Sequence, residues 1–247
     1  MVKKISTIAF LSDTHNRHEI IEKRFGIPQC DIIIHAGDFT MLGYEDEVES
    51  FFDWYSALPI PNKVVIAGNH EIFFDPTAIK KYEKGRRFNR IKTLNPRDIV
   101  PENITYLENE SAVVSGIKMY GSPYQPEFYD WAFNIRRGKS LEACWDLIPD
   151  DTELLITHAP PMGHLDVNNR GKNVGCSDLK ARIFSLNKLK THVFGHIHQS
   201  RGVDISGGIT YINASNLDES YKPVHKPMVF DLFDDGSCKQ IEKWTRI

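Results

Sequence analysis

The chain has 247 residues, of which 41% are hydrophobic, and this suits one α/β domain with a sizeable core. The 30 Lys and Arg residues against 33 Asp and Glu residues give a formal net charge of −3. A mildly acidic chain lacks the basic excess of proteins that follow a nucleic-acid backbone, so a nucleic-acid polymer is a disfavoured partner. No repeat, low-complexity run or linker divides the sequence, and we expect a single domain over residues 1–247.

The first apolar stretch stops at Ser12-Asp13, which is too early for a signal peptide or a membrane span. The four cysteines are scattered and form no CxxC pair, a pattern typical of reduced thiols. We therefore expect a soluble, cytoplasmic protein with no membrane partner. The sequence carries no indication of its oligomeric state.

The first third of the chain alternates between apolar runs and a helical pattern. Short apolar runs over Ile5–Leu11, Asp31–His35 and Asn62–Ala67 predict buried strands. Apolar residues spaced by three and four predict a helix over Glu45–Leu58. Strands separated by helices indicate parallel pairing.

The closely spaced runs Ile104–Leu107, Ala112–Ser115 and Ile117–Tyr120 suggest antiparallel hairpins. The segment Tyr124–Lys139 has no periodicity and predicts a long loop over one face. A helix is expected over Ser177–Leu186, with Ser177 as its N-cap. Further strands are expected over Glu153–Thr157, His192–Phe194, Ile209–Ile212 and Met228–Phe233.

This pattern predicts an α/β fold in which two mixed β-sheets pack together between outer helices, a four-layer α/β/β/α sandwich.

Polar clusters follow the apolar runs at the points where the predicted strands end. Because ligands bind beyond the carboxyl ends of strands in open α/β sheets, five such ends would converge on one patch. The glycines before three of these clusters would let the backbone pass close to the site or adopt positive φ. The clusters are Asp13-Thr14-His15, Gly37-Asp38, Gly68-Asn69-His70-Glu71, His158 and Gly195-His196-Ile197-His198.

These residue types suit a pair of divalent cations. Residues two apart in an extended chain point the same way, so Asp13 and His15 can face one cation, or His196 and His198 can straddle two. Imidazole, carboxylate and amide groups favour Mn²⁺, Fe²⁺ or Zn²⁺ over Ca²⁺. Two cations roughly 3.5–4 Å apart can clamp the attacking and leaving oxygens of an in-line displacement at phosphorus.

The motifs DxH, GD, GNHE, H and GHxH resemble those of the calcineurin-like metallophosphoesterase superfamily. The resemblance implies a two-sheet sandwich with a dinuclear site, with Asp13, His15 and His198 on one metal and Asp38 bridging both. It places the remaining ligands, Asn69, His158 and His196, on the second metal.

The same resemblance implies that His70 contacts the substrate phosphate and can protonate the leaving oxygen. Asn69 and Glu71 complete the implied catalytic group, and Glu71 would orient or tune His70.

A closer resemblance, to the metallophosphoesterase-domain-containing (MPPED) family, runs over nearly the whole chain. It is carried by SDTHNR, HAGDFTMLG, KVVIAGNHEIFFD, MYGSPYQP, THAPPMGH, VFGHIH, TYINASN and KPMVFDL. That family is related to the class III cyclic nucleotide phosphodiesterases, and it implies a metal-activated phosphodiesterase with Mn²⁺ favoured and Fe²⁺, Zn²⁺ or Mg²⁺ as alternatives. One member lacks a histidine of GHxH and has weak activity, whereas this chain keeps both His196 and His198.

We therefore expect hydrolysis of cyclic nucleotides or related small phosphodiesters by in-line attack of a metal-bound hydroxide. A weakly active nucleotide-binding or scaffolding protein and a nuclease or phosphomonoesterase remain as alternatives. Phosphoprotein phosphatases that resemble this chain carry an arginine shortly after the GD motif. Residues Phe39–Gly43 contain no arginine, so a phosphoprotein substrate is disfavoured.

Several other residues have a structural and a functional interpretation. Arg17 can reach a substrate phosphate or can be a solvated arginine at a helix start. Arg170 and Lys172 can form a nucleotide-facing rim, and the basic run Lys80–Arg90 is expected to be a solvated face. His35 is expected in the core or behind the ligands. Surface or packing positions are expected for His18, His164, His192 and His225.

Overall fold

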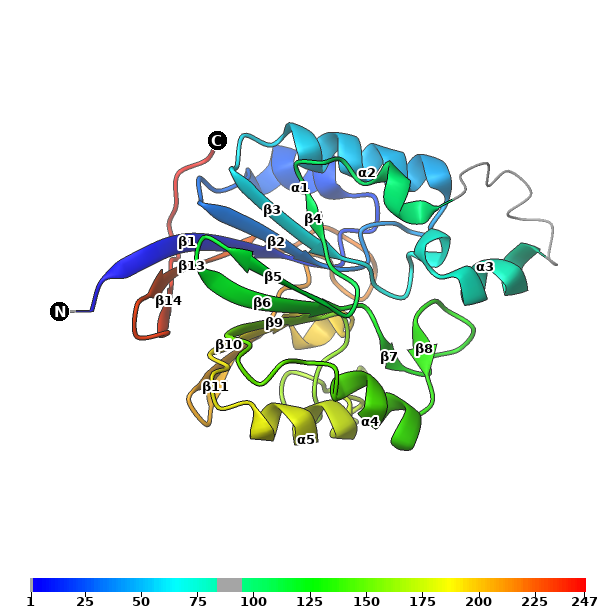
Figure 1. Ribbon diagram of the computed structural model, residues 1–247. Coiled ribbons are helices and arrows are strands. Elements are labelled where there is room, and N and C mark those ends of the chain that lie inside the picture. Colours follow the sequence, from blue (N-terminus) through cyan, green and yellow to red (C-terminus); the bar gives the residue numbers. More distant parts are fainter. Residues whose placement is uncertain (1, 84–94) are drawn as a thin grey trace.

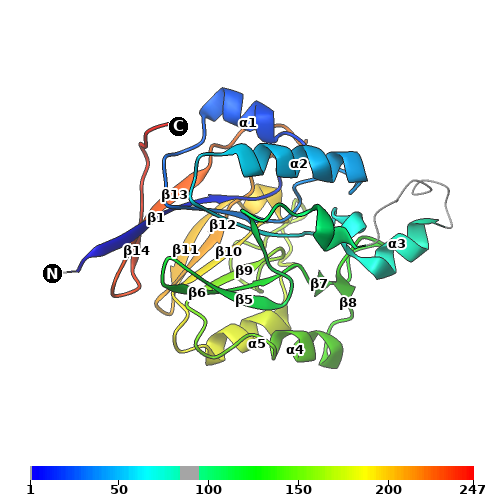
Figure 2. The same cartoon turned by 45° about the horizontal axis from the view of Figure 1, so that its top comes forward.

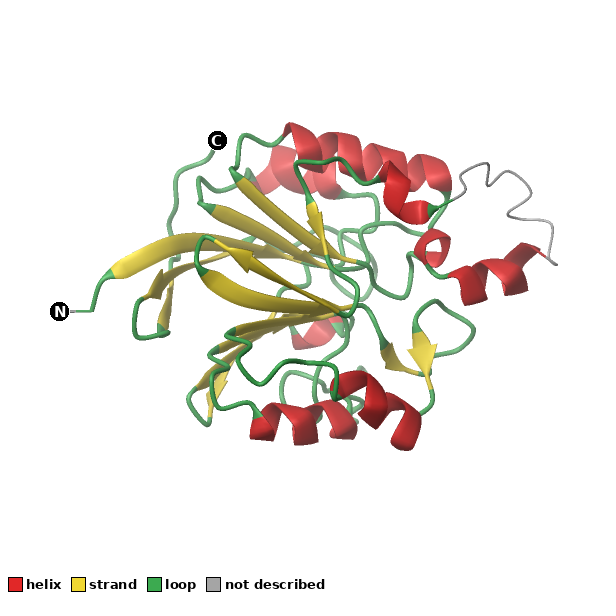
Figure 3. Ribbon diagram, in the orientation of Figure 1, coloured by secondary structure: helices red, strands yellow, loops and turns green. Residues whose placement is uncertain are grey.

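The computed structural model describes residues 2–83 and 95–247. Most of the basic run predicted from Lys80 to Arg90 lies outside these residues. Two layers of strands lie between two layers of helices, with α1 (His18–Phe25) and α2 (Glu45–Ala57) on one side and α4 (Lys139–Trp145) and α5 (Ser177–Ser185) on the other (Figures 1 and 3). The predicted four-layer α/β/β/α sandwich is confirmed.

The first sheet has six strands in the order β14-β13-β1-β2-β3-β4. Strands β1 to β4 pair in parallel, and β13 and β14 add an antiparallel edge. The strands are β1 (Lys4–Leu11), β2 (Ile32–Ala36), β3 (Asn62–Ile66), β4 (Thr105–Tyr106), β13 (Met228–Phe233) and β14 (Cys238–Gln240).

The second sheet is also mixed, in the order β11-β12-β10-β9-β6-β5. Its four central strands are parallel, and β5 and β11 are antiparallel edges. The strands are β5 (Glu110–Val114), β6 (Ile117–Ser122), β9 (Leu154–Thr157), β10 (Thr191–Phe194), β11 (Gly202–Ser206) and β12 (Ile209–Asn213).

The alternation of side chains along each central strand explains the layers. In β1, Ile8 and Phe10 face the other sheet, while Ala9 and Leu11 pack beneath the helices. In β9, Leu154 and Ile156 likewise face the first sheet, and Leu155 packs towards α4 and α5. Because both faces are buried, these strands are continuous apolar runs, the feature by which the sequence reveals them.

Two local predictions were wrong. Residues 105–106 form β4, which pairs in parallel with β3 and not in a hairpin, whereas β5 and β6 do form the predicted antiparallel pair. Helix α5 begins at Ser177, but its N-cap is Cys176, whose Sγ accepts the Leu179 N–H at 3.3 Å. A buried cysteine sulfur thus takes the place of the hydroxyl that cap preferences favour.

The segment predicted as a loop from Tyr124 to Lys139 contains the short pair β7 (Gln125–Pro126) and β8 (Asn134–Ile135) and ends at the start of α4. This pair lies at the end of the molecule opposite the two chain termini (Figures 1 and 2). Helix α3 (Pro76–Glu83) lies at the same end. Within residues 2–83 and 95–247, no helix is long and apolar enough to cross a bilayer.

Candidate metal centre

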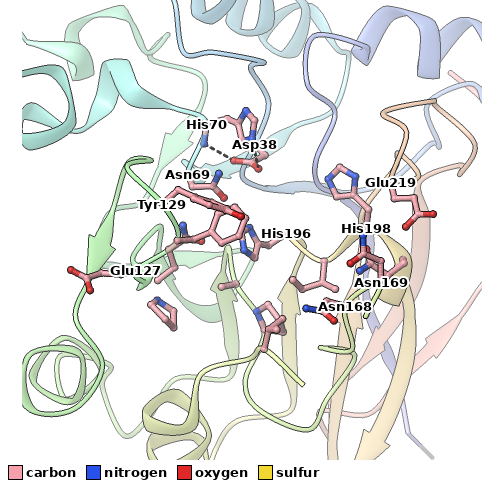
Figure 4. Close-up of a pocket in the computed structure, with 18 of the residues that line it drawn as sticks. Asp38, Asn69, His70, Glu127, Tyr129, Asn168, Asn169, His196, His198 and Glu219 are labelled. Carbon is pink, nitrogen blue, oxygen red and sulfur yellow. Dashed lines mark hydrogen bonds and ion pairs between the residues drawn. The ribbon is translucent and has the colours of Figure 1, made fainter. Parts of the chain in front are cut away.

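The five predicted clusters meet at the carboxyl ends of parallel strands from both sheets. Asp13 and His15 follow β1, Asp38 follows β2, and Asn69 follows β3. From the second sheet, His158 follows β9, and His196 and His198 follow β10. Figure 4 shows Asp38, Asn69, His196 and His198 around one cavity.

One ligand group combines Asp13, His15 and His198, whose donor atoms lie within 4.8 Å of one another. The Nε2 atom of His198 is 3.2 Å from Asp13 Oδ1 and 3.4 Å from His15 Nε2. All three side chains are buried or nearly so. A carboxylate and two imidazoles converging in this way form a suitable site for a divalent transition metal.

A second group combines Asp38, His158 and His196. His158 Nε2 lies 3.2 Å from Asp38 Oδ2 and 3.1 Å from Asn69 Oδ1, so the Asn69 amide oxygen joins this group. The same Asp38 oxygen is 3.7 Å from His15 Nε2, in the first group. Asp38 therefore lies between the two groups, where a bridging carboxylate belongs.

Backbone carbonyls orient three of the four ligand histidines. The Nδ1 atoms of His15, His158 and His198 lie 3.0, 2.9 and 2.9 Å from carbonyl oxygens, which can only accept a hydrogen bond. Each Nδ1 therefore carries a proton, which leaves Nε2 as the atom that would offer its lone pair to a cation. The acceptors belong to Thr40, Ala36 and Asp218. This donor set fits two cations.

The carboxylate of Asp13 is fixed by residues that follow strands of the second sheet. The main-chain N–H of His196 donates to both of its oxygens at 3.0 Å, and Ser215 Oγ donates to Oδ2 at 2.7 Å. Gly195 permits this approach, because a Cβ there would collide with Asp13 Oδ2. Glycine is thus required before His196 because the backbone there passes too close to Asp13 for a side chain.

Several residues at the centre have a left-handed backbone conformation. Asp13, His15, Asn16, Asp38 and His196 have φ between 39° and 67°. Asp, Asn and His tolerate this region better than most residues, at a cost of order 1–3 kcal/mol each. Strain is therefore concentrated where the donor atoms converge.

Burial and charge together set the pKa values of the metal-free centre. Burial lowers the pKa of His15 and His196 to about 3. Burial also disfavours the charged form of His158 and His198, but Asp38 and Asp13 respectively outweigh it and raise their pKa to about 9. The pKa of Asp38 is below its usual range, because the imidazoles around it outweigh its burial.

Glu71 is fully buried beneath the centre and joins two of the loops. Its carboxylate accepts the main-chain N–H groups of Asp38, Thr40 and Gly68 and the Thr40 hydroxyl. Burial and the charge of Asp38 raise its pKa to about 8. None of these bonds involves the His70 ring, whose Nδ1 donates to the Met41 carbonyl.

His70 faces the cavity beside Asp38. Its Nε2 atom is 3.9 Å from Asp38 Oδ2, and its main-chain N–H donates to Asp38 Oδ1 at 2.8 Å. The indole of Trp131 stacks on the ring with centroids 4.1 Å apart and planes 24° apart. Trp131 was not predicted from the sequence, because it lies in an aperiodic segment far from the motifs in the chain.

A cavity of about 580 Å³ opens over the centre. His15, Asp38, Asn69, His70, His196 and His198 all contribute to its lining. Of the two interpretations of Arg17, its position favours the solvated arginine, because it is exposed beside the start of α1. The lining arginines in the described chain are Arg137 and Arg170, and Lys172 is not among the lining residues.

The remaining histidines occupy structural positions. His18, His35 and His192 are buried, and His35 Nε2 hydrogen-bonds the Thr14 hydroxyl at 3.0 Å, behind the ligands. His164 pairs with Asp204 at 2.6 Å, and His225 is half-buried. These are the packing positions that the sequence indicated.

Solved structures with this arrangement define the fold class. The chain is similar to TT1561 of Thermus thermophilus, with a TM-score of 0.59 and 14% identity over 96% of this chain and 98% of that one. It is also similar to a phosphopantetheinyl hydrolase from Mycobacterium tuberculosis, with a TM-score of 0.57 and 13% identity over 97% of both chains. The fold is that of the metallophosphoesterases.

Sequence relatives identify the family. Residues 6–200 match the family described as Calcineurin-like phosphoesterase. The chain is 42% identical over 230 residues to the human metallophosphoesterase domain-containing protein 1, covering 90% of this chain and 69% of that protein. It is 36% identical over 233 residues to a UPF0046 protein of Caenorhabditis elegans, covering 89% and 58% respectively. The chain belongs to the calcineurin-like phosphoesterase family, whose members typically hold two metal ions, and this membership indicates a hydrolase.

Proposed function

We propose that the chain is a phosphodiesterase for small phosphodiesters, with cyclic nucleotides as the first class of substrate, and that Mn²⁺ is its preferred metal. The observation that carries the proposal is the position of Asp38 between two groups of donor atoms, 3.7 Å from His15 and 3.2 Å from His158. Two cations, when bound there, would lower the pKa of coordinated water and polarise the phosphoryl oxygens.

The protein's own residues provide orientation and proton transfer. His70 Nε2 faces the cavity while its Nδ1 is fixed on the Met41 carbonyl, so this ring can contact a phosphoryl oxygen and pass a proton to the leaving oxygen. Arg170 on the rim can attract an anionic substrate. A centre enclosed by residues from both sheets admits a small ester more readily than a folded phosphoprotein.

Hydrolysis of bis-p-nitrophenyl phosphate by EDTA-treated protein resupplied with Mn²⁺ tests the proposal. We expect no turnover without metal, restoration by Mn²⁺ above Zn²⁺ or Mg²⁺, and at least a hundredfold loss in Asp38→Asn, which keeps the shape of the side chain. Arg17→Gln is the matched control, because Arg17 is exposed and outside the cavity lining, and it should retain the wild-type rate.

A substrate panel decides the class of ester. Faster hydrolysis of 2′,3′- or 3′,5′-cyclic nucleotides than of nucleoside monophosphates and single-stranded DNA would support the proposal. Equal rates from wild type and Asp38→Asn, or a preference for monoesters, would contradict it.

A further inference from the structure

We propose that Phe128 and Tyr129 form an aromatic platform that holds the nucleobase of a phosphate ester beside the centre. The inference deepens the proposed function and rests on it for the class of ester. It assigns a binding role to two residues that belong to none of the metal-binding motifs.

The two rings lie in the same cavity as the second ligand group. The Phe128 ring centroid is 5.2 Å from that of His196, with the planes 87° apart, and 4.8 Å from that of Tyr129. Both residues line the cavity together with Asn69. In Figure 4 the Tyr129 side chain projects over the cavity on the side of Asn69 and His196.

Both rings are more exposed to solvent than is usual for large aromatic side chains. Phe128 is 42% exposed and Tyr129 is 81% exposed, and both line the cavity. A planar ligand stacked here would cover aromatic surface that the fold leaves in water. Stacking of one base on an aromatic side chain strengthens binding roughly 5- to 150-fold.

The platform is preformed, because the turn that carries it is fixed by Asn134. The Asn134 Nδ2 group donates to the carbonyls of Phe128 and Tyr129, at 3.3 and 2.9 Å, and its Oδ1 accepts the Phe128 N–H at 3.1 Å. Tyr129 has φ +50°, a conformation that aromatic residues rarely adopt, and these bonds maintain it. Little conformational entropy would therefore be lost when a ring binds.

The loop is also tied directly to a metal ligand. The Ala132 N–H donates to the Asn69 carbonyl at 3.0 Å, so the platform has a fixed distance from the centre. The polar side chains of Asn168, Asn169 and Gln199 line the same cavity. Their amides can bond the heteroatoms of a base, which favours a nucleobase over a hydrocarbon ring.

Calorimetry with the Mn²⁺-loaded full-length protein tests the platform by comparing adenosine 5′-monophosphate with ribose 5-phosphate. The two ligands share the sugar and the phosphate and differ only in the base. We expect wild type to bind the nucleotide at least about 5-fold more tightly. Tyr129→Asn and Phe128→Leu should each bring this ratio towards one without changing the affinity for ribose 5-phosphate.

The variants are chosen so that a folding defect is not mistaken for a loss of base binding. Asn tolerates positive φ, so Tyr129→Asn removes the ring without adding strain. Phe184→Leu is the control, since Phe184 on α5 is 93% exposed and outside the cavity lining, and it should keep the wild-type ratio.

A wild-type ratio of one, or a ratio that stays at the wild-type value in both platform variants, would overturn the inference. If wild type fails to hydrolyse any diester but shows a base-dependent ratio that the variants lose, the platform is supported and the proposed function fails alone.

Discussion

The carboxylate of Glu71 illustrates how one buried residue positions several ligands without facing the cavity. Its hydrogen bonds fix the main chain at Asp38 and Gly68, next to two donor atoms of the second ligand group. A carboxylate can accept all of these bonds because it carries no hydrogen when ionised, and in the metal-free protein this form prevails above the Glu71 pKa of about 8. The number of hydrogen-bond donors around this side chain thus explains why it is a glutamate.

Glu71→Gln should lower the free energy of unfolding by about 1–3 kcal/mol, because the amide NH₂ would face main-chain N–H groups and leave them unpaired. Urea unfolding of the EDTA-treated protein at a pH above 8, where Glu71 is ionised, measures this change. Glu49→Gln, on the exposed face of α2, should have little effect. Equal stability of wild type and Glu71→Gln would show that the bonds around Glu71 are replaceable.

Ser215 offers a second prediction at this scale. Its hydroxyl donates to Asp13 Oδ2 at 2.7 Å, and loss of such a supporting bond weakens metal binding roughly 10- to 100-fold. Titration of Ser215→Ala with Mn²⁺ should show this loss. Ser6→Ala removes an equally buried hydroxyl that has no hydrogen-bond partner among the described residues, and this variant should bind metal as wild type does. Identical affinities for both variants would contradict the role of Ser215.

The segment from β7 to β8 brings three functions to the centre from one stretch of chain. It supplies the platform, the indole that stacks on His70, and the N–H that bonds the Asn69 carbonyl. An element of this kind can change its side chains while the metal ligands, which follow other strands, stay in place.

Trp131→Leu should lower kcat roughly 10- to 100-fold with a smaller change in KM, because the His70 ring would lose the face that restricts its orientation. Steady-state kinetics with bis-p-nitrophenyl phosphate measures both constants. Trp54→Leu is matched in size: Trp54 lies in α2, bonds Glu22, and should affect stability but not kcat. An unchanged kcat in Trp131→Leu would contradict a positioning role.

The strands and the convergence of the candidate metal ligands could be predicted because both have strong local signals. The apolar runs before Asp13, Asp38 and Asn69 mark central strands, and each run stops at its ligand. The orienting carbonyls of Ala36, Thr40 and Asp218 could not be predicted, since every residue has a carbonyl and only the fold selects these. Trp131 and Tyr129 were missed for a similar reason: their positions depend on long-range contacts.

β4 was mispredicted on a related ground. Proximity in sequence favoured a hairpin for residues 105–106, but the actual neighbour is β3, which lies many residues earlier.

For the whole molecule, buried neutral histidines make the stability depend on pH. Burial lowers the pKa of His192 to about 3. Its Nε2 hydrogen-bonds Thr157 Oγ1 at 2.8 Å, and its Nδ1 has no partner in the part of the chain that the structure describes. An unfolded chain would protonate this ring near pH 6.5, so below that pH the unfolded state binds more protons. Stability should therefore fall as pH drops from 6.5 towards 3.

Chemical unfolding of the metal-free protein between pH 4.5 and 7.5 tests this. Below pH 6.5, the free energy of unfolding of wild type should fall with decreasing pH more steeply than that of His192→Gln, by about 1.4 kcal/mol per pH unit. Above pH 7 the two slopes should agree. Parallel curves throughout would show that His192 titrates alike in both states.

Each ligand group draws its donors from both sheets, with Asp13 and His15 opposite His198, and Asp38 and Asn69 opposite His158 and His196. A disordered chain cannot gather such distant atoms, so cations should bind the native state almost exclusively. Above saturation, every tenfold increase in the free cation concentration would then add about 1.4 kcal/mol per ion to the free energy of unfolding. Resistance to proteolysis, and hence the amount of the protein that a cell retains, should therefore increase with the concentration of its metal.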